Sequence, residues 1–342
     1  PCCLVGSEMC IRDRYQRDYV FFDEYMEECL YSEYGFFNTT KIRSSKDGDF
    51  LTSPEVSNHF GLFISNWIDS NKIKNNIVEI GPGTGSLASQ IINYSKKNLF
   101  LIEKSETAFL TLKDKEFNVF KTLDKVPAED IDLIYMNEVL DNISCSIGVY
   151  KEHNWFEKVI QLDSESLSYN LAPIRADSLS WIKQNNIEPL DDFEVEIQTN
   201  ITTYLSKIVE QFNPKFLLII DYGYENHERS GKPYKSLIRT YKNHHLAGET
   251  ILQPTSTDIT YDVNFSSVKT SLSDLGFAVE LLSQKEFLER HGFISFYKKM
   301  QSEFHNADGL DKLKIKSDLV GLEAICNERG LGGFKILSAK KI

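Results

Sequence analysis

The chain has 342 residues, 41% of them hydrophobic, and a formal net charge of −12 at pH 7. It is long enough for one large core, or a core with a smaller companion, and its negative charge argues against nonspecific affinity for phosphate backbones or anionic membranes. No apolar run approaches the about 20 residues of a membrane-spanning helix. We therefore expect a soluble intracellular protein with no nucleic-acid partner and no membrane span, whose partner or substrate is basic.

The first residues, 1–14, lack an initiator methionine and any periodicity, so we interpret them as a lead-in that is not native to the fold. The six cysteines have neither C-x-x-C spacing nor paired histidines nearby: Cys2, Cys3, Cys10, Cys29, Cys145 and Cys326. Neither a disulfide framework nor a metal site is expected.

Residues 15–72 are predicted to form an N-terminal helical cap. Apolar side chains recur at three- and four-residue intervals from Tyr19 to Leu30, and a second apolar stripe consists of Phe60, Phe63, Ile64, Trp67 and Ile68. Between them, Thr52 or Ser53 can cap a helix with Pro54 in its first turn. The segment Gly48–Ser57 is either a helix cap alone or a loop lying over a cofactor, and composition does not distinguish these two interpretations.

The stretch Ile77–Leu87, with the sequence IVEIGPGTGSL, is the most informative in the chain. A short run of branched apolar residues, typical of a buried strand, breaks into Gly81, Gly83 and Gly85 before helical spacing begins. Glycines let a backbone turn sharply and let a ligand approach it, and a helix start presents unpaired N–H groups. The order strand, glycine turn, helix predicts a nucleotide-type pocket.

Two acidic residues bear on which nucleotide binds. A G-x-G-x-x-G dinucleotide pattern would place its third glycine at position 86, where this chain has Ser86. Glu79, just before the turn, gives a pyrophosphate no favourable interaction but suits the sulfonium and ammonium of S-adenosylmethionine (SAM). Glu103, which ends the next strand, can accept hydrogen bonds from ribose hydroxyls, and this suits NAD equally. We predict SAM in preference to NAD.

Beyond this loop the chain alternates strands and helices. Strands are predicted at 99–102, 118–120, 131–136, 216–220 and 277–282, a hairpin at 148–152 and 155–162 with its turn at His153-Asn154, and helices at 265–275 and 286–293. Apolar strands separated by helices imply an α/β fold with a mostly parallel sheet and helices on both faces. The irregular stretch Tyr224–Asp262 is too long for a plain connection, which favours a functional insertion.

Polar side chains follow the ends of three strands: the glycine turn, then Asn137 and Glu138 with Asp141, then Asp221. Ligands bind at the carboxyl ends of such strands. Methyl transfer is an in-line displacement, so the enzyme mainly aligns the nucleophile. A guanidinium nucleophile would be held by Glu138 and Asp141, and one of them would take its proton. The alternative interpretation is a solvated helix start that complements the helix dipole.

Five motifs, in order, resemble those of the MidA-like SAM-dependent methyltransferases: Gly48-Asp49-Phe50 with Thr52–Glu55, Glu79–Gly85, Asn137-Glu138 with Asp141, Asp221–Gly223, and Asp258–Thr260 with Asp262–Phe265. They span roughly residues 20 to 338. The resemblance implies a Rossmann-like class I methyltransferase domain at 73–342, with added helical and β-hairpin segments inserted at about 145–200 and 224–262.

The resemblance also implies roles for particular residues. Gly81, Gly83 and Glu103 would bind SAM, and Asn137, Glu138 and Asp141 would line the reaction site as catalytic residues. Together with the residues argued above, the predicted cofactor contacts are Glu79, Gly81, Gly83, Gly85, Glu103 and Asn137.

The family's mitochondrial member is a protein arginine methyltransferase that acts on a subunit of respiratory complex I during assembly. By this resemblance we expect a protein substrate with a basic, arginine-containing segment, and a complex I subunit is the leading candidate. The expected location is the cytoplasm in a bacterium, or the mitochondrial matrix in a eukaryote. The sequence does not indicate an oligomeric state.

The sequence departs from the family pattern after the fourth strand, where it reads N-E-V-L-D-N-I-S rather than N-E-F-F-D-A-L-P. Because the pocket wall differs, two other functions stay open: a small-molecule methyltransferase, and an assembly factor that binds SAM without essential turnover. Arg239, in a basic and aromatic stretch, either pairs with a carboxylate of SAM or with an acid of the protein. His244 and His245 are interpreted as loop histidines.

Overall fold

The computed structural model describes residues 18–38, 52–74, 76–95, 97–127, 130–162, 166–229, 236–242, 245–246, 248–251 and 254–342. The chain divides into two compact units. Unit 1 comprises Pro1–Lys41, Leu140–Lys207 and Gly223–Ser271, and unit 2 comprises Ile42–Val139, Ile208–Tyr222 and Leu272–Ile342. The predicted lead-in, 1–14, lies outside the described residues.

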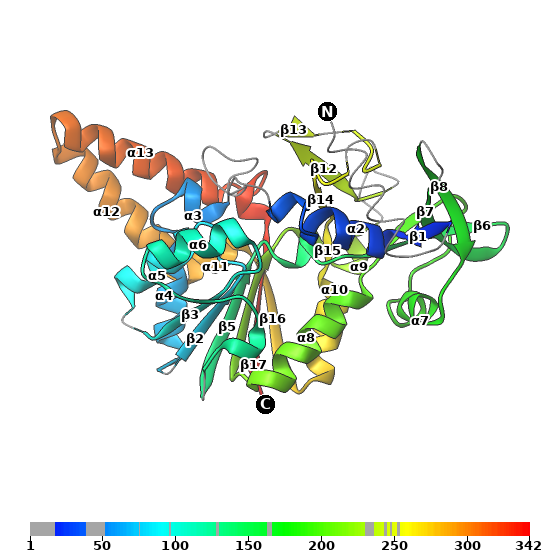
Figure 1. Ribbon diagram of the computed structural model, residues 1–342. Helices are drawn as coiled ribbons and strands as arrows, with labels where there is room; N and C mark the ends of the chain where they lie inside the picture. The colour runs from blue at the N-terminus through cyan, green and yellow to red at the C-terminus, as the bar shows by residue number, and fades with distance from the viewer. Residues whose placement is uncertain are drawn as a thin grey trace. The chain divides into compact units, whose positions relative to one another are not determined.

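Unit 2 contains a seven-stranded sheet in the order β16-β17-β10-β5-β2-β3-β4 (Figure 1). Its strands are β2 (Asn76–Ile80), β3 (Leu99–Ile102), β4 (Asn118–Phe120), β5 (Ile131–Asn137), β10 (Phe216–Asp221), β16 (Phe277–Ser283) and β17 (Lys335–Lys341). The five strands from β10 to β4 pair in parallel, and β17 runs antiparallel to both of its neighbours. The predicted mostly parallel α/β sheet is confirmed.

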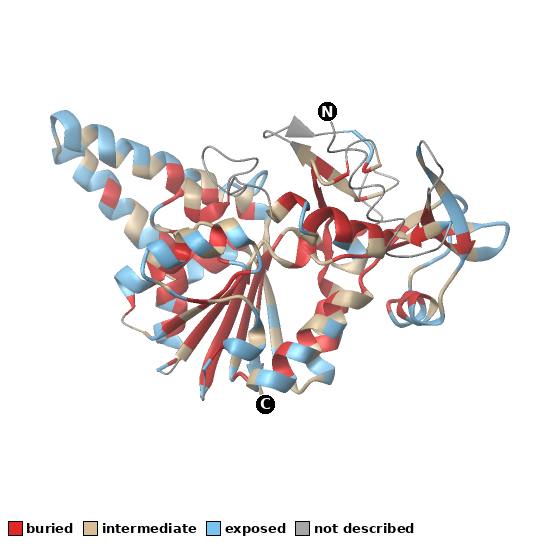
Figure 2. Ribbon diagram, in the orientation of Figure 1, coloured by how far each residue is buried: buried red, intermediate tan, exposed pale blue. Residues whose placement is uncertain are grey.

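The central strands are nearly continuous apolar runs because their residues are buried, as Figure 2 shows for this sheet. Helices pack against the sheet through one hydrophobic cluster, to which α4 contributes Phe60, Phe63, Ile64, Trp67 and Ile68. These are the five residues of the predicted apolar stripe.

The helices of unit 2 are α3 (Ser53–Val56), α4 (Phe60–Ser70), α5 (Ser86–Tyr94), α6 (Glu106–Asp114), α11 (Gln284–Arg290), α12 (Phe293–Asn306) and α13 (Gly309–Cys326), with short 3-10 turns η2 (Leu123–Lys125) and η4 (Leu331–Gly333). The helix predicted over 286–293 is present, but it ends earlier than expected. The helix ends at Arg290 because Gly292, at φ +105°, adopts a left-handed conformation, and a new helix starts at Phe293.

Unit 1 contains a second, antiparallel sheet in which β1 (Tyr19–Phe21), β7 (Asn154–Leu162), β6 (Ser146–Lys151) and β9 (Glu194–Ile197) are neighbours in that order, and β8 (Leu167–Pro173) also pairs with β7. The predicted hairpin is present, but its turn lies one residue earlier than expected. Glu152 and His153 have φ values of +51° and +64°, which is the left-handed pair that a two-residue hairpin turn needs.

The remaining elements of unit 1 are short. Strand β11 (Gly223–Tyr224) pairs with β15 (Val263–Asn264), and β12 (Arg239–Lys242) lies between β13 (His245–Leu246) and β14 (Asp258–Thr260). The helices are α2 (Phe22–Tyr31), α7 (Ala176–Gln184) and α9 (Asn226–Arg229), with 3-10 turns η1 (Phe36–Asn38) and η3 (Leu140–Asn142). The unit boundary falls within α8 (Thr199–Phe212) and α10 (Phe265–Asp274).

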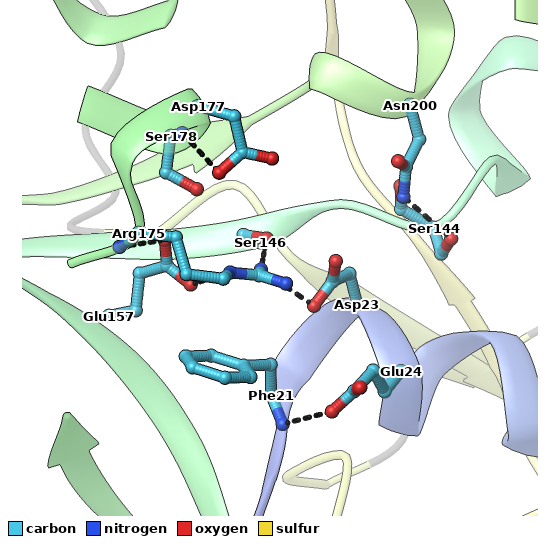
Figure 3. A network of polar contacts seen from close by, with 10 residues as sticks. All are labelled: Phe21, Asp23, Glu24, Ser144, Ser146, Glu157, Arg175, Asp177, Ser178 and Asn200. Atoms are coloured by element: carbon cyan, nitrogen blue, oxygen red, sulfur yellow. Dashed lines mark hydrogen bonds and ion pairs between the residues drawn. The ribbon is translucent and has the colours of Figure 1, made fainter. Parts of the chain in front are cut away.

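Arg175 joins several elements of unit 1 through a partly buried polar network (Figure 3). Its Nε donates to Glu157 Oε2 at 2.8 Å, and its Nη2 donates to Asp23 Oδ1 at 2.9 Å and to Ser146 Oγ at 2.6 Å. The guanidinium carbon lies 4.0 Å from the centre of the Phe21 ring. Because Glu157 is fully buried, Arg175 supplies the positive charge that makes burial of this carboxylate tolerable.

The two units can be compared with the expected domain boundaries. The expected N-terminal cap, 15–72, contributes residues 18–38 to unit 1 and residues 52–72 to unit 2. The expected insertions, 145–200 and 224–262, lie within the two longer segments of unit 1. These domain boundaries stay predictions. Among the helices of the described residues, none is both long and apolar enough to cross a lipid bilayer.

Candidate functional site

The glycine turn between β2 and α5 has a backbone that other residues would adopt only with strain. Gly81, Gly83 and Gly85 have φ values of +68°, +53° and +76°. A Cβ on Gly81 would lie 2.7 Å from Val139 Cγ2, and one on Gly85 would lie 2.6 Å from Leu112 Cδ2. The turn therefore leaves bare backbone at the start of α5, as the sequence predicted.

Glu103 follows β3 and holds this turn. Its Oε2 accepts the Gly83 N–H at 3.1 Å, and its Oε1 accepts the Ser105 N–H at 2.7 Å. Burial raises the pKa of Glu103 to about 7, although these two hydrogen bonds favour the ionised form. A ribose with two hydroxyl donors would add to the hydrogen bonds that stabilise the carboxylate.

Glu79 lies one position before the end of β2 and is 2% exposed. The Tyr135 hydroxyl, on the neighbouring strand β5, donates to Glu79 Oε2 at 2.8 Å. Burial raises the pKa of Glu79 to about 8, the Tyr135 hydrogen bond opposes this rise, and the charge of Glu103 adds to it. Two buried acids with raised pKa values on adjacent strands favour a cationic ligand, because a cation stabilises both ionised forms.

The segment before α4 contacts the glycine turn. Thr84 Oγ1 donates to Glu55 Oε1 at 3.1 Å, while Glu55 Oε2 accepts the Thr52 N–H at 3.4 Å as part of a helix cap. Gln90 Nε2 donates to Pro54 O at 2.6 Å, which ties α3 to α5. The helix-cap interpretation is confirmed, and the segment also contacts the turn, whereas a position over the cofactor stays a prediction. The Gly48–Leu51 part lies outside the described residues.

Asn137 and Glu138 lie at the end of β5. Glu138 has φ +53°, a left-handed conformation that is strained for a residue other than glycine, and its N–H donates to Ile220 O at 2.8 Å. Asn137 Nδ2 donates to Glu138 Oε1 at 3.2 Å. Asn137 Oδ1 is buried and has no hydrogen-bond partner among the described residues, so it is an acceptor that a ligand N–H or O–H would satisfy.

Asp141 belongs to unit 1, whereas the other predicted site residues belong to unit 2. Its Oδ2 accepts the Thr260 hydroxyl at 2.7 Å. The Tyr261 hydroxyl lies 3.0 Å from Leu140 O and 2.6 Å from Ile143 O, so that η3 and β14 are held together. The D-I-T motif thus fixes the segment that carries Asp141.

Two further predicted residues have defined surroundings. Arg239 forms an ion pair with Asp262 of the D-V-N-F motif, which favours the acid of the protein over a carboxylate of SAM as its partner. Asp221, at the end of β10, is fully buried and its Oδ1 accepts the Tyr222 N–H at 2.9 Å. His244 and the side chain of His245 lie outside the described residues.

Sequence reasoning missed three groups at this site: Tyr135, Ser105 and the Thr84–Glu55 contact. Tyr135 lies directly opposite Glu79 in the β2–β5 pairing, which becomes predictable only once these strands are known to be neighbours. Ser105 is the N-cap of α6, and its position two residues after Glu103 could have indicated from the sequence that the two residues interact.

The residues present fit a cationic nucleoside. The turn offers backbone without side chains, Glu79 and Glu103 provide buried carboxylates, and Asn137 Oδ1 provides an unsatisfied acceptor. Within the described part of the chain, no group of three or more His, Cys, Asp or Glu side chains is arranged to hold a metal ion.

Comparison with known proteins gives consistent results. The model of a family of S-adenosyl-L-methionine-dependent methyltransferases matches residues 61–282. Similar relatives include the mouse mitochondrial protein arginine methyltransferase NDUFAF7, 25% identical over 92% of this chain and 76% of that protein, and its Caenorhabditis elegans homologue, 25% identical over 79% and 72%.

Among solved structures, a COG1565 superfamily member from Burkholderia thailandensis, described as a methyl transferase bound to S-adenosyl-homocysteine, matches with a TM-score of 0.81. It is 18% identical and covers 100% of this chain and 94% of its own. At this identity, the match shows a shared fold.

Proposed function

Because this chain belongs to the MidA-like family of SAM-dependent methyltransferases, we propose that it methylates an arginine side chain of a partner protein. The cofactor prediction, SAM in preference to NAD, is confirmed by the family. The mouse and nematode relatives are named protein arginine methyltransferases, which supports a protein substrate and arginine as the acceptor.

The observation that carries the proposal is the position of Glu138. Glu138 directly follows the central strand β5, and ligands of parallel sheets bind at the carboxyl ends of the strands. Its carboxylate is the kind of group that binds a guanidinium through charge-assisted hydrogen bonds. Asn137 Nδ2 fixes this carboxylate through Oε1.

The donor side is formed by the glycine turn and the acids beside it. SAM, when bound, supplies a methyl group on a positively charged sulfur. Gly81, Gly83 and Gly85 give the cofactor access to backbone, and Glu103 accepts its ribose hydroxyls. Glu79 lowers the energy of positive charge near the turn, and Asn137 Oδ1 accepts a cofactor N–H or O–H.

On the acceptor side, Glu138 holds the guanidinium and orients one nitrogen for in-line attack. Carboxylate binding at the other nitrogens biases electron density toward the reacting one, and Glu138 takes the proton that this nitrogen loses. Asp141 stays the second carboxylate that the sequence predicts, and within unit 1 Thr260 fixes the rotamer of its side chain.

We further propose a partner of the respiratory chain, a complex I subunit in particular, because the sequence motifs match the family whose mitochondrial member acts there. The relatives are named as mitochondrial proteins, which supports the matrix as the location in a eukaryotic host. In a bacterial host the proposed location is the cytoplasm.

The test is methyl transfer from labelled SAM to a cell lysate, followed by mass mapping of the labelled residues. We expect label on arginine, and we expect Glu138→Ala to lower turnover by about a hundredfold or more while SAM affinity changes less than twofold. Glu152→Ala is the matched control, because Glu152 is an exposed glutamate with nearly the same φ, +51°.

Other outcomes would point elsewhere. Label on a small molecule supports a metabolite methyltransferase, and SAM binding without any transfer supports an assembly factor. An unchanged rate for Glu138→Ala would refute the catalytic assignment. Gly83→Arg fills the turn and should abolish SAM binding, which checks the donor side separately.

A further inference from the structure

Helix α13 carries apolar residues on two opposite faces, which is unusual for a helix at the surface of a protein. One face contains Ile315, Leu319, Leu322 and Ile325, and all four belong to or pack against the main hydrophobic cluster of unit 2. Gly321 fits closely on α3, since a Cβ there would lie 2.6 Å from Val56 O. This inner face accounts for the docking of α13.

The outer face contains Leu310, Leu313, Ser317 and Val320, at helical spacings of three and four residues. The apolar side chains among them are 84% (Leu310), 64% (Leu313) and 57% (Val320) exposed. Figure 2 shows exposed positions along much of α13. Burial of this stripe in a complex would be favourable, because it removes three large apolar side chains from water.

Lysines flank this outer stripe on both sides. At 100° per residue, Lys314 and Lys316 lie on opposite sides of the line from Leu313 to Ser317. Both lysines are exposed, and neither has an ion-pair partner among the described residues. By contrast, Asp318 lies 3.7 Å from His59, and Glu323 accepts the Tyr297 hydroxyl. Lys314 and Lys316 thus place positive charge beside the stripe on a chain whose net charge is −12.

Two other acids lie near the tip of the α12–α13 hairpin, Asp308 and Asp311. Asp311 is exposed and lies between the two faces, four residues before Ile315 and three before Lys314, and no ion pair joins it to Lys314 among the described residues. Asp308 is the N-cap residue of α13. Lys312 lies 5.1 Å from the centre of the Phe304 ring, on the side toward α12. The stripe consequently has an apolar centre with one exposed lysine at each edge, Lys314 and Lys316.

We propose that the outer face of α13 is a docking site for an acidic amphipathic helix of a partner protein. Leu310, Leu313 and Val320 receive the apolar face of that helix, and Lys314 and Lys316 pair with carboxylates along its two edges. This surface is separate from the glycine turn and does not depend on the chemistry proposed there. A second copy of the chain is the competing occupant.

The experiment uses the full chain and two synthetic helices that share one leucine stripe, flanked in one peptide by glutamates and in the other by lysines. Fluorescence anisotropy measures the binding of each peptide. We expect the acidic peptide to bind and the basic one to bind at least about tenfold more weakly. The double variant Lys314→Glu/Lys316→Glu should reverse this preference, and Leu313→Ser should weaken both peptides.

Leu110→Ser is the matched control, because Leu110 is a 51% exposed leucine on another helix, α6, and this change should leave binding unaltered. SAM affinity and thermal unfolding should be unchanged in every variant, since all of these side chains are exposed. Absence of saturable binding by the acidic peptide, or equal binding of both peptides, overturns the proposal. A dimer on sizing chromatography that Leu313→Ser dissociates also overturns it, in favour of a second copy.

Discussion

The carboxylate of Glu103 accepts the Gly83 N–H at 3.1 Å, so that the acid after β3 and the turn after β2 are directly joined. A second bond, from the Ser105 N–H at 2.7 Å, fixes the other carboxylate oxygen. Glu103 therefore orders the turn, and in the proposed function it also accepts hydrogen bonds from a ribose.

Replacing Glu103 with alanine should weaken SAM binding strongly, because the change removes the charge-assisted hydrogen bond to the Gly83 N–H of the turn and the one to the Ser105 N–H, together with the ribose acceptor. We expect a loss of about 2–4 kcal/mol in binding free energy, measured by calorimetry. Glu106→Ala is the control, since Glu106 is an exposed glutamate near Glu103 that pairs with Lys121. Equal effects of the two substitutions would contradict the role of Glu103.

The raised pKa values of Glu79, to about 8, and Glu103, to about 7, predict a pH-dependent stability. Carboxyl groups in the unfolded chain ionise near 4.5, so the folded protein binds more protons than the unfolded one between that value and about 8. The free energy of unfolding of the cofactor-free protein should therefore fall as the pH rises through this window. Below about pH 4.5 both carboxyl groups are protonated in the folded and in the unfolded chain, so neither group lowers the free energy of unfolding there.

Urea unfolding of the wild type and of Glu79→Gln at several pH values measures this effect. Because glutamine does not titrate, the variant should lose part of the slope between about pH 5 and 8. SAM affinity should show the opposite trend and rise with pH over the same range, since a cation favours the ionised carboxylates. A variant slope as steep as that of the wild type would show that Glu79 keeps an ordinary pKa.

The sequence was sufficient to predict the features that depend on local pattern. The continuous apolar runs of β2, β3, β5 and β10 identified the parallel sheet, because strands buried on both faces lose their polar alternation. The glycine turn was recognisable because three left-handed positions require three glycines.

Features that depend on which elements become neighbours were missed. The Tyr135 hydroxyl meets Glu79 only because β5 pairs with β2 in one register, and no local pattern marks this pairing. From the sequence, Arg239 had two possible partners, a carboxylate of SAM or an acid of the protein. In the structure β12 approaches the D-V-N-F motif, and Arg239 forms an ion pair with Asp262. The apolar residues on both faces of α13 also obscured its helical period.

Removal of Arg175 should destabilise unit 1, because Glu157 would keep a fully buried carboxylate without its cation. We expect Arg175→Ala to lower the free energy of unfolding by about 2–3 kcal/mol, somewhat less than for a fully dry ion pair, since the Arg175 side chain is 30% exposed. Urea titration measures the loss.

Arg290→Ala is a suitable comparison for Arg175→Ala. Arg290 also pairs with a glutamate, Glu280, at 2.6 Å, but both side chains are about half exposed, so its removal should change stability little. If both substitutions cost the same, burial of Glu157 is not what makes the Arg175 network important. Adding Glu157→Gln to Arg175→Ala should recover part of the lost stability, because it removes the uncompensated charge.

Gly81→Ala should impair both folding and cofactor binding, and a second glycine separates the two causes. Gly81 combines φ +68° with a Cβ position 2.7 Å from Val139 Cγ2, whereas Gly276, at φ +85°, has no atom within 4 Å of its Cβ position. Gly276→Ala therefore reports the cost of the left-handed backbone alone, about 1 kcal/mol of unfolding free energy. Gly81→Ala should cost about 2–3 kcal/mol because it adds the steric conflict.

The added conflict can be relieved by a second substitution. Val139→Ala removes the methyl group that a Cβ on Gly81 would meet, so the double variant should regain stability relative to Gly81→Ala, although Val139→Ala alone should destabilise. SAM affinity should fall for Gly81→Ala and stay unchanged for Gly276→Ala, since only the former lies in the turn. Thermal unfolding and calorimetry measure these effects, and purely additive losses from Gly81→Ala and Val139→Ala would contradict the close approach of this turn to Val139.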